Sequence, residues 1–380
     1  MFAVVDRRRD GDSMRAMAEI QDPALGLIQV LGTEREKDVS FDTDALIAMY
    51  RHMLRVRLLD ERMMKRQRQG KIGFFGAITG QEATPVAAAF CLQPQDWVFP
   101  ALRENAIMLV RGFPLTKWLG QVYGNAADVL KGRQMPSHMS GREVNQVAWS
   151  SCLGPQLPQA VGAAWAAKIK GHKDVVTLGF IGDGATSEPD FHVAMNFAGV
   201  YKPPCVMICQ NNHWAISVPS SKQTKSETFA VKAKAYGVPG IRVDGNDVIA
   251  LREVIGEAVE RARSGGGPTF IEALTYRIGA HSSSDDPSVY RSEAEVDEWR
   301  KKDPLLRFEA YLEDRGLLPD EAREPLEEEI QAEITEAIKI VEAAGPPERA
   351  SLFDDVFGEL PWHLKEQREE MLAAEPAPSH

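Results

Sequence analysis

The chain has 380 residues, of which 44% are hydrophobic and 26% are charged, and its formal net charge is −11. This composition is typical of a soluble globular protein with a large core. The negative charge argues against a nucleic-acid backbone or an anionic membrane as the main partner, because either would repel the chain. No apolar run approaches the roughly 20 residues needed to span a bilayer. The N-terminus also lacks the apolar core of a signal peptide, so we expect a cytoplasmic protein.

The four cysteines, Cys91, Cys152, Cys205 and Cys209, each stand among apolar residues, and none belongs to a CxxC pair. This pattern favours reduced thiols packed in the core over disulfides or a metal site.

The first half of the chain is predicted to be mostly helical. Residues 1–40 are mixed in composition and are expected to form an N-terminal extension. A long helix follows over 42–70, with Asp42 or Thr43 as its N-cap and Gly70 at its end. The next elements are a glycine-broken segment with two aromatic residues at 74 and 75, a helix over 85–92, a short strand over 96–100 and a helix over 154–171.

The centre of the chain alternates strands and helices. Strands are predicted over 174–181, 204–210, 241–245 and 269–277, with helices over 187–200, capped by Ser187, and over 247–267, capped by Asp247. The strands are continuous apolar runs, as expected where helices cover both faces of a sheet. The predicted fold class is therefore α/β, with a doubly wound, mostly parallel sheet and helices on both faces. After an amphipathic helix over 324–347, we expect one main domain over 41–345 and a small C-terminal segment over 346–380.

Polar residues follow two consecutive strands of this unit. Asp183 lies between two glycines after the strand over 174–181, and Asn212 follows the strand over 204–210. Because parallel strands place their carboxyl ends at one edge of the sheet, these side chains are expected to be neighbours. A carboxylate and an amide oxygen are partial ligands for Mg²⁺, which also takes phosphate oxygens. The glycine turn and the following helix offer backbone N–H groups to an anion, so the pattern indicates a site for a metal and a diphosphate.

A dinucleotide-binding site is the competing interpretation. The fingerprint G-x-G-x-x-G requires a third glycine, and this chain has Ser187 there. A dinucleotide-dependent oxidoreductase is therefore disfavoured. A lone Gly-Asp-Gly would most simply be an ordinary turn, but the paired asparagines after the next strand favour a functional site.

The stretch "GDGATSE", followed by "QNNHWAIS", resembles the thiamine diphosphate motif. The resemblance extends through "GKIGFFGAITGQEA", "DWVFPALREN", "KGRQMPSHMS", "YRIGAHSSSDDPSVYRS" and "FDDVFGELPWHL", and covers roughly residues 45–365. The chain resembles the alpha subunits of the thiamine-dependent component of 2-oxo acid dehydrogenase complexes. It is more similar to the branched-chain 2-oxoisovalerate type than to the pyruvate type. The resemblance to this family implies the thiamine diphosphate-binding fold.

The resemblance implies a role for each of several residues. Metal ligation is implied for Asp183, Asn212 and the carbonyl group of Trp214. Contact with the cofactor is implied for Arg103, His281, Gly182, Gly184 and Ala185 at the diphosphate and for Ser151 and Leu153 at the aminopyrimidine. The substrate pocket is implied to be bordered by Phe74 and Phe75.

Simpler roles remain possible for those residues whose role is implied by the resemblance alone. Arg103 could form a surface ion pair, His281 could be an ordinary loop histidine, and the others could only pack. The sequence also departs from the family pattern at two positions. Leu102 stands where a tyrosine usually contacts the diphosphate, and Pro155 stands where relatives can hold potassium with a threonine.

The implied activity is oxidative decarboxylation of a 2-oxo acid with transfer of the acyl group to the lipoyl-bearing acyltransferase of the complex, with thiamine diphosphate and Mg²⁺ as cofactors. His281 is the candidate catalytic residue for the lipoyl step. A separate beta subunit is implied to complete an α2β2 heterotetramer, and Ser282 and Ser292 match regulatory phosphorylation sites of mitochondrial relatives. Pyruvate or acetoin dehydrogenase is the alternative, and a non-catalytic binding subunit remains open if no beta subunit exists.

Overall fold

The centre of the fold is a five-stranded parallel sheet. The structure, a computed structural model, describes residues 26–319 and 321–375, so the first 25 residues of the expected N-terminal extension lie outside the described residues. The strand order is β1-β2-β3-β7-β6, and all neighbouring strands are parallel. The strands are β1 (Trp97–Phe99), β2 (Thr177–Gly182), β3 (Cys205–Asn211), β7 (Thr269–Leu274) and β6 (Gly240–Asp244). The predicted α/β class is confirmed.

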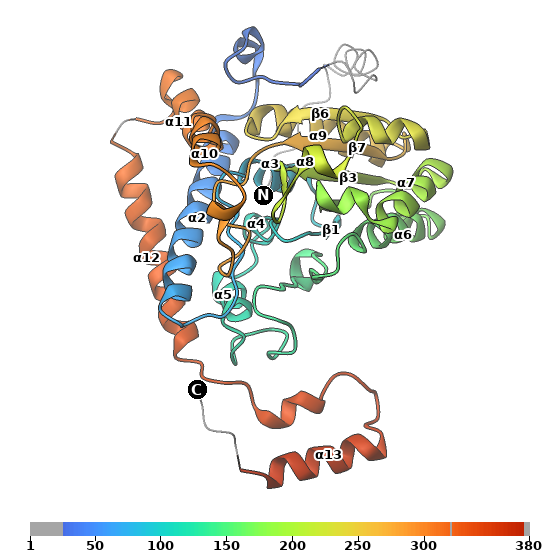
Figure 1. Ribbon diagram of the computed structural model, residues 1–380, viewed down its shortest axis with the longest axis vertical. Helices are drawn as coiled ribbons and strands as arrows, with labels where there is room; N and C mark the ends of the chain where they lie inside the picture. Colours follow the sequence, from blue (N-terminus) through green and yellow to red (C-terminus); the bar gives the residue numbers. More distant parts are fainter. Residues whose placement is uncertain (1–25, 320, 376–380) are drawn as a thin grey trace.

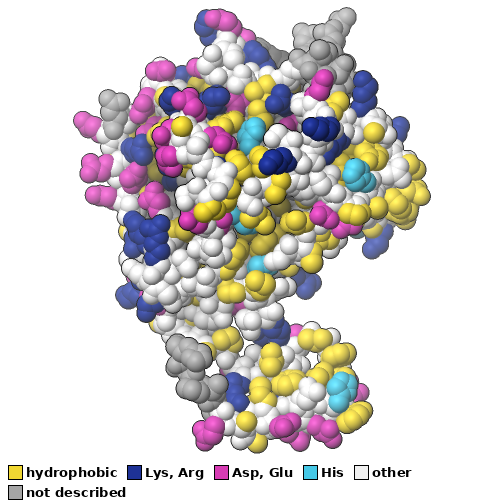
Figure 2. All heavy atoms as spheres, viewed as in Figure 1, with side chains coloured by type: hydrophobic (Ala, Val, Ile, Leu, Met, Phe, Trp, Pro, Cys, Tyr) yellow, Lys and Arg dark blue, Asp and Glu magenta, His cyan; other side chains and the backbone are white. Residues whose placement is uncertain are grey.

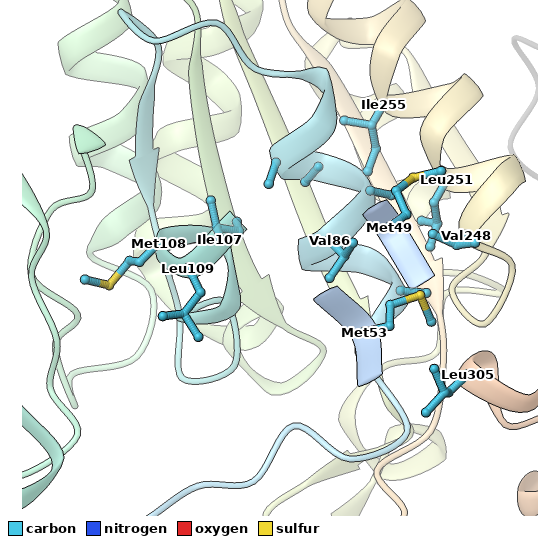
Figure 3. Close-up of a cluster of buried hydrophobic side chains, with 14 of the residues drawn as sticks. Met49, Met53, Val86, Ile107, Met108, Leu109, Val248, Leu251, Ile255 and Leu305 are labelled. Carbon is cyan, nitrogen blue, oxygen red and sulfur yellow. The ribbon is translucent and has the colours of Figure 1, made fainter. Parts of the chain in front are cut away.

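Helices cover both faces of the sheet (Figure 1). One face packs against α2 (Thr43–Arg68), α3 (Ala83–Cys91) and α9 (Val248–Arg263), and the other packs against α6 (Gln156–Ile169) and α7 (Pro189–Tyr201). Successive residues of a strand point to opposite faces. Accordingly, Val206 and Ile208 of β3 lie in the first core, whereas Cys205, Met207 and Cys209 lie in the second. Figure 3 shows part of the first core, where Met49 and Met53 of α2 lie near Val86 of α3 and Leu251 of α9.

The predicted helix caps are correct at two of three positions. The carboxylate of Asp42 accepts the N–H of Asp44 and begins α2, and Asp247 accepts the N–H groups of Ile249 and Ala250 and begins α9. The expectation that Ser187 caps the next helix is wrong. Residues Gly184–Ser187 form a 3₁₀ turn, and α7 begins at Pro189.

The remaining elements surround this centre. Several helices are additional to the predicted elements, among them α4 (Ala106–Val110), α5 (Leu115–Tyr123), α10 (Glu293–Arg300) and α11 (Pro304–Asp314). A small antiparallel hairpin, β4 (Trp214–Ala215) with β5 (Val218–Pro219), leads into the four-residue α8 (Ser220–Gln223). Beyond these, α12 (Arg323–Glu342) packs on α2 and α5, and α13 (Trp362–Ala373) lies near the C-terminus. None of the described helices combines the length and the apolarity that crossing a membrane requires.

Both edges of the sheet are covered by extended chain. At the β6 edge, Ile28 exchanges backbone hydrogen bonds with Arg242 (3.0 Å) and Asp244 (2.9 Å). At the β1 edge, Val98 pairs in the same way with the backbone of Asn145 and Val147. This protects the edge strands from pairing with another chain, so the described part of the N-terminal region completes the sheet.

The C-terminal segment projects away from the sheet. Figure 1 shows residues 346–375 as an arm below the body, in which α13 packs on the short 3₁₀ helix Arg349–Phe353. Asp355 ties the arm to the body through Lys131 (2.5 Å) and Arg133 (3.1 Å). The arm carries apolar side chains on its surface (Figure 2), including Trp362, which is 72% exposed.

The cysteine prediction is correct only in part. Cys205 and Cys209 are buried in β3 and Cys91 is half-buried, but Cys152 is exposed. Cys152 lies in the loop before α6, outside any helix or strand, where its side chain is exposed.

Candidate active site

Two adjacent strands, β2 and β3, bring Asp183 and Asn212 to the same edge of the sheet. Gly182, the last residue of β2, is in register with Gln210 of β3, so Asp183 directly after β2 and Asn212 directly after β3 reach the same edge. Asp183 is 1% exposed and Asn212 is 8% exposed. Two oxygen-bearing side chains are therefore buried together where open α/β sheets bind their ligands.

The buried carboxylate of Asp183 is approached by the backbone N–H groups of Asp183 itself and of Asn212 and by the hydroxyl of Ser220. Ser220 Oγ donates to its Oδ2 at 3.2 Å. Burial raises the pKa of Asp183 to about 6, because desolvation disfavours the charged form. A cation beside this carboxylate would restore the charged form.

The amide of Asn212 has a defined orientation. The backbone N–H of Trp214 donates to its Oδ1 at 3.2 Å, and its Nδ2 donates to Gln81 Oε1 at 2.9 Å. Because a backbone N–H can only donate, the side-chain oxygen of Asn212 must lie on the side of the 212–214 turn. That oxygen therefore faces the segment that carries the Trp214 carbonyl.

Arg277 holds the hairpin that follows. It donates to the Trp214 carbonyl at 3.3 Å and to the Ile216 carbonyl at 2.7 Å, and it is 1% exposed. His213 and Ile216 have positive φ angles of 69° and 54°, which let the chain fold back tightly. The carbonyl predicted to complete the metal site is thus held by a buried cation.

The two glycines around Asp183 have different roles. A Cβ atom on Gly182 would meet nothing within 4 Å, whereas a Cβ on Gly184 would lie 2.6 Å from the Cβ of Ala215. Gly182 therefore leaves open space for a ligand, and Gly184 lets the hairpin approach the turn closely. Ala185 is 5% exposed and packs in the second core.

Arg103 is a buried cation with an unsatisfied donor. It is 6% exposed, and its Nη2 donates to the backbone carbonyl of His281 at 2.8 Å. Its Nη1 is buried without a hydrogen-bond partner among the described residues. Burial, followed by the nearby charge of Arg277, lowers the pKa of Arg103 to about 10. A buried guanidinium group in this state fits an anionic ligand.

The loop that contains His281 is ordered by its own hydrogen bonds. Asp285 Oδ2 accepts the backbone N–H of His281 at 2.7 Å and the hydroxyl of Tyr290 at 2.6 Å. Tyr290 in turn accepts a hydrogen bond from Arg277 at 2.8 Å. Burial, Arg103 and Arg277 lower the pKa of His281 to about 4, so its imidazole is neutral near pH 7.

The two serines of interest in this region differ in exposure. Ser282 is 7% exposed, and its hydroxyl pairs with that of Ser284 at 3.1 Å. Ser292 is exposed and caps α10 by accepting the N–H of Glu295 at 3.3 Å. The structure thus places Ser282 beside the site residue His281, and Ser292 at a helix start on the surface.

Ser151 and Leu153 lie on an open side of the site. Leu153 is 61% exposed, and Ser151 is also exposed. The hydroxyl of Ser151 is hydrogen-bonded to Nε2 of His138, and Nδ1 of His138 lies 3.2 Å from the Pro136 carbonyl. Within the described residues, nothing covers the residues expected to contact the aminopyrimidine.

The two phenylalanines of the glycine-broken segment point to different environments. Phe75 is 4% exposed and packs edge-on against Trp118, whereas Phe74 is half-buried and lies 6.1 Å, ring to ring, from His138. The backbone of Phe75 is joined to Ser283, with 2.9 Å between the Ser283 nitrogen and the Phe75 carbonyl oxygen. A small pocket beside Arg103 is lined by mostly apolar residues, among them Phe75, Leu59, Leu102, Trp118 and Met139.

Two residues that support the site are additional to the predicted set. Gln81 orients Asn212, and Ser220 contacts Asp183. Gln81 is fully buried, and it follows a glycine before an apolar helix, a position where a buried polar side chain is unusual. Ser220 lies in a polar turn where the sequence gives no signal.

The residues present fit a metal–diphosphate ligand. The open space over Gly182, the buried carboxylate of Asp183 and Nη1 of Arg103, which has no partner among the described residues, all lie at the carboxyl edge of the sheet. Among the described residues, no cluster of three or more His, Cys, Asp or Glu side chains could hold a metal. A site here would therefore need amide, carbonyl and phosphate oxygens beside the one carboxylate, which is the set that Mg²⁺ accepts.

Comparisons with known proteins identify the family to which the chain belongs. Residues 50–350 match the family described as the dehydrogenase E1 component. The chain is 42% identical over 344 residues to the 3-methyl-2-oxobutanoate dehydrogenase subunit alpha of Mycobacterium tuberculosis, covering 90% of each chain. It is 40% identical over 343 residues to 2-oxoisovalerate dehydrogenase subunit alpha 2, mitochondrial, of Arabidopsis thaliana, covering 90% of this chain and 72% of the relative. With the mitochondrial alpha subunit of Homo sapiens, the identity is 39% over 336 residues, covering 88% of this chain and 75% of the relative. The chain therefore belongs to the dehydrogenase E1 component family, as an alpha-type subunit.

Proposed function

We propose that this chain is the alpha subunit of a branched-chain 2-oxo acid dehydrogenase that uses thiamine diphosphate and Mg²⁺. The observation that carries the proposal is the burial of Asp183 and Asn212 at one edge of the sheet, where Arg103 also lies with no hydrogen-bond partner for its Nη1 among the described residues. A metal cation between the Asp183 carboxylate and a diphosphate removes the repulsion between these two negative groups, and the positive charge of Arg103 offsets part of the remaining negative charge.

Each residue of the site then has a defined task. Asp183, Asn212 and the Trp214 carbonyl would hold Mg²⁺. Gly182, Gly184 and Ala185 would border the diphosphate, with Arg103 and His281 donating to its oxygens. Ser151 and Leu153 would contact the aminopyrimidine, and Phe74 and Phe75 would border the substrate. When bound, thiamine diphosphate supplies the electron sink for decarboxylation.

His281 is proposed to handle a proton while the acyl group passes to lipoyl on the acyltransferase. Burial, followed by the charges of Arg103 and Arg277, lowers the pKa of His281, so its imidazole is neutral near pH 7. A diphosphate would offset both arginines and so raise the pKa of His281, which favours the acceptance and donation of protons by its imidazole. Binding of the cofactor would thus activate the residue.

A separate beta subunit is proposed to complete the site in an α2β2 assembly. Two observations support this. Leu153, expected at the cofactor, is 61% exposed, so one side of the site is open. Apolar side chains are also exposed on two surfaces, which are the C-terminal arm, with Phe357 and Trp362, and the outer face of α6 and α7, with Ile169 and Val200. Such surfaces mark protein interfaces.

The substrate is proposed to be a branched-chain 2-oxo acid, as the names of the relatives state for those proteins. Pyruvate or acetoin dehydrogenase is the alternative, because one methylene changes recognition by only about 1–3 kcal/mol. A cytoplasmic location is part of the proposal. The plant and animal relatives named above are mitochondrial, while the name of the mycobacterial relative gives no compartment.

The test is co-purification of the chain with a beta subunit, followed by kcat/KM for 3-methyl-2-oxobutanoate and for pyruvate. We expect the branched acid to be preferred, the chain alone to be inactive, and Asp183→Ala to abolish Mg²⁺-dependent binding of thiamine diphosphate. Full activity of the isolated chain would refute the proposal that a beta subunit completes the site. Undiminished cofactor binding by Asp183→Ala would refute the site.

A further inference from the structure

The hydroxyl of Ser220 lies between two side chains of the sheet edge. Its Oγ is 3.2 Å from Oδ2 of Asp183 and 3.3 Å from Oδ1 of Asn211. Ser220 belongs to α8, which follows the β4–β5 hairpin, so it reaches the site from a different segment than either strand. The family match does not assign a role to this residue.

Asn211 cannot donate to Ser220, because its amide is held in one orientation. Its Nδ2 donates to Glu272 Oε1 at 2.8 Å, and its Oδ1 accepts the backbone N–H of His213 at 3.1 Å. Glu272 is itself fixed, since it is 1% exposed and its Oε2 accepts the N–H of Ala230 at 2.9 Å. The serine hydroxyl therefore faces two acceptors with one proton. When Asp183 is ionised, donation to its carboxylate is the stronger of the two hydrogen bonds.

The backbone of Ser220 closes the hairpin that carries the Trp214 carbonyl. Its N–H donates to the carbonyl of His213 at 2.9 Å, directly beyond the pairing of Trp214 with Pro219. The hairpin also touches the turn after Asp183, because Gly184 has no side chain to keep Ala215 away. One residue thus joins the Asp183 carboxylate to the segment that presents a second oxygen.

We propose that Ser220 is a positioning residue of the metal site. Its hydroxyl sets the rotation of the Asp183 carboxylate, while its backbone N–H, bonded to the His213 carbonyl, closes the hairpin that carries the Trp214 carbonyl. The inference rests on the proposed function for the metal itself. Residues that orient metal ligands in this way typically change metal affinity by about 10–100-fold when they are removed.

The test compares four variants of the alpha chain in its complex with the beta subunit. Ser220→Ala removes the hydroxyl and Ser220→Thr retains it. Ser221→Ala is the matched control, because Ser221 is the next residue of the same helix and is exposed. Asp183→Ala tests the metal site independently of Ser220. The readouts are the Kd for Mn²⁺, measured by electron paramagnetic resonance with thiamine diphosphate present, and the melting temperature.

We expect Ser220→Ala to raise the Kd for Mn²⁺ by about 10–100-fold, with kcat largely recovered at saturating metal. Ser220→Thr and Ser221→Ala should bind Mn²⁺ as the wild type does. Wild-type affinity in Ser220→Ala beside lost affinity in Asp183→Ala would overturn the role of Ser220 and leave the proposed function standing. Wild-type affinity in both would overturn the metal site. If Ser220→Ala does not fold, Ser220→Cys takes its place, because a thiol is a weak donor of similar size. Unchanged Mn²⁺ affinity in that variant would equally refute the proposal.

Discussion

Arg103 donates a hydrogen bond of 2.8 Å to the backbone carbonyl of His281, although 178 positions separate the two residues in the chain. The contact joins the turn after β1 to the loop after β7, and it leaves Nη1 of Arg103 buried without a partner among the described residues. One arginine thus both fixes the loop and offers a donor to the site.

Replacing Arg103 by methionine should weaken binding of thiamine diphosphate without unfolding the chain. Methionine keeps the apolar stem but loses the charge, and a hydrogen bond to a charged group contributes about 1.5–3 kcal/mol. We expect Kd for the cofactor to rise at least about tenfold, measured by quenching of tryptophan fluorescence. Arg142→Met, at an exposed position, serves as the control. Equal affinity in the two variants would contradict the assignment of Arg103.

The pKa of His281 should depend on Arg103. Burial, Arg103 and Arg277 together lower this pKa to about 4 in the cofactor-free protein. Removing Arg103 removes one of the two repelling charges, so the pKa should rise in Arg103→Met. Titration of ¹³C-labelled histidines by NMR, with His281→Gln to assign the signal, measures both values. A signal that titrates near 6.5 in the wild type would contradict the burial of this imidazole.

The same shift predicts how His281 affects stability. Its folded-state pKa of about 4 lies below the ordinary value of 6.5, so the unfolded chain binds the proton more tightly. The neutral histidine is fully accommodated above pH 6.5, and stability falls as the pH drops from 6.5 toward 4. His281→Gln should lose less stability than the wild type over that window, as measured by urea unfolding. If the free energy of unfolding depended on pH in the same way in both proteins, the titration of His281 would not contribute to the pH dependence of stability.

The pairing of Asp183 with Asn212 could be predicted from the sequence because it depends only on chain order. Alternating apolar strands and helices make a parallel sheet, and parallel strands end at one edge. The meeting of Arg103 with His281 could not be derived this way, because it depends on the turn after β1 and the long loop after β7, and neither segment has a periodic pattern. Only the resemblance to a family indicated these two residues.

The prediction that Ser187 caps a helix is wrong for a local physical reason. A serine before a helix is a common N-cap, but here the chain forms a 3₁₀ turn in which Thr186 Oγ1 donates to the Asp183 carbonyl at 2.8 Å. Ser187 Oγ instead donates to Gln223 on α8 at 3.2 Å. The requirement to hold the turn after Asp183 outweighs the capping preference. The roles of Gln81 and Ser220 could not be predicted for a related reason, because each role depends on a tertiary contact with another side chain.

A negative charge at Ser282 should lower activity, whereas one at Ser292 should be tolerated. Ser282 is 7% exposed beside His281, so Ser282→Glu would bury a carboxylate where a diphosphate is expected. Ser292 is exposed at the start of α10, where an acidic residue is favourable. We expect kcat to fall at least about tenfold for Ser282→Glu, as for the loss of a positioned proton-transfer group. Ser292→Glu should retain nearly wild-type kcat. Unchanged kinetics in Ser282→Glu would remove the case for regulation at this loop.

The C-terminal arm should be needed for assembly rather than for folding of the alpha chain. Trp362 is 72% exposed and Phe357 is 51% exposed, and the arm is joined to the body by the ion pairs of Asp355 with Lys131 and Arg133. Replacing both aromatic residues by serine removes little buried surface from the isolated chain, so its melting temperature should stay near the wild-type value. Loss of the same side chains from an interface should weaken association, because large aromatic residues dominate binding energy.

Sedimentation of the co-expressed subunits measures the outcome of this double replacement. We expect the Phe357→Ser, Trp362→Ser protein to dissociate from the beta subunit at concentrations where the wild type stays assembled. Leu306→Ser is the control, since Leu306 is 51% exposed on α11, away from the arm. Assembly that survives the double replacement would leave the outer face of α6 and α7 as the interface, and Val200→Asp with Ile169→Asp would then be the variant that dissociates the complex.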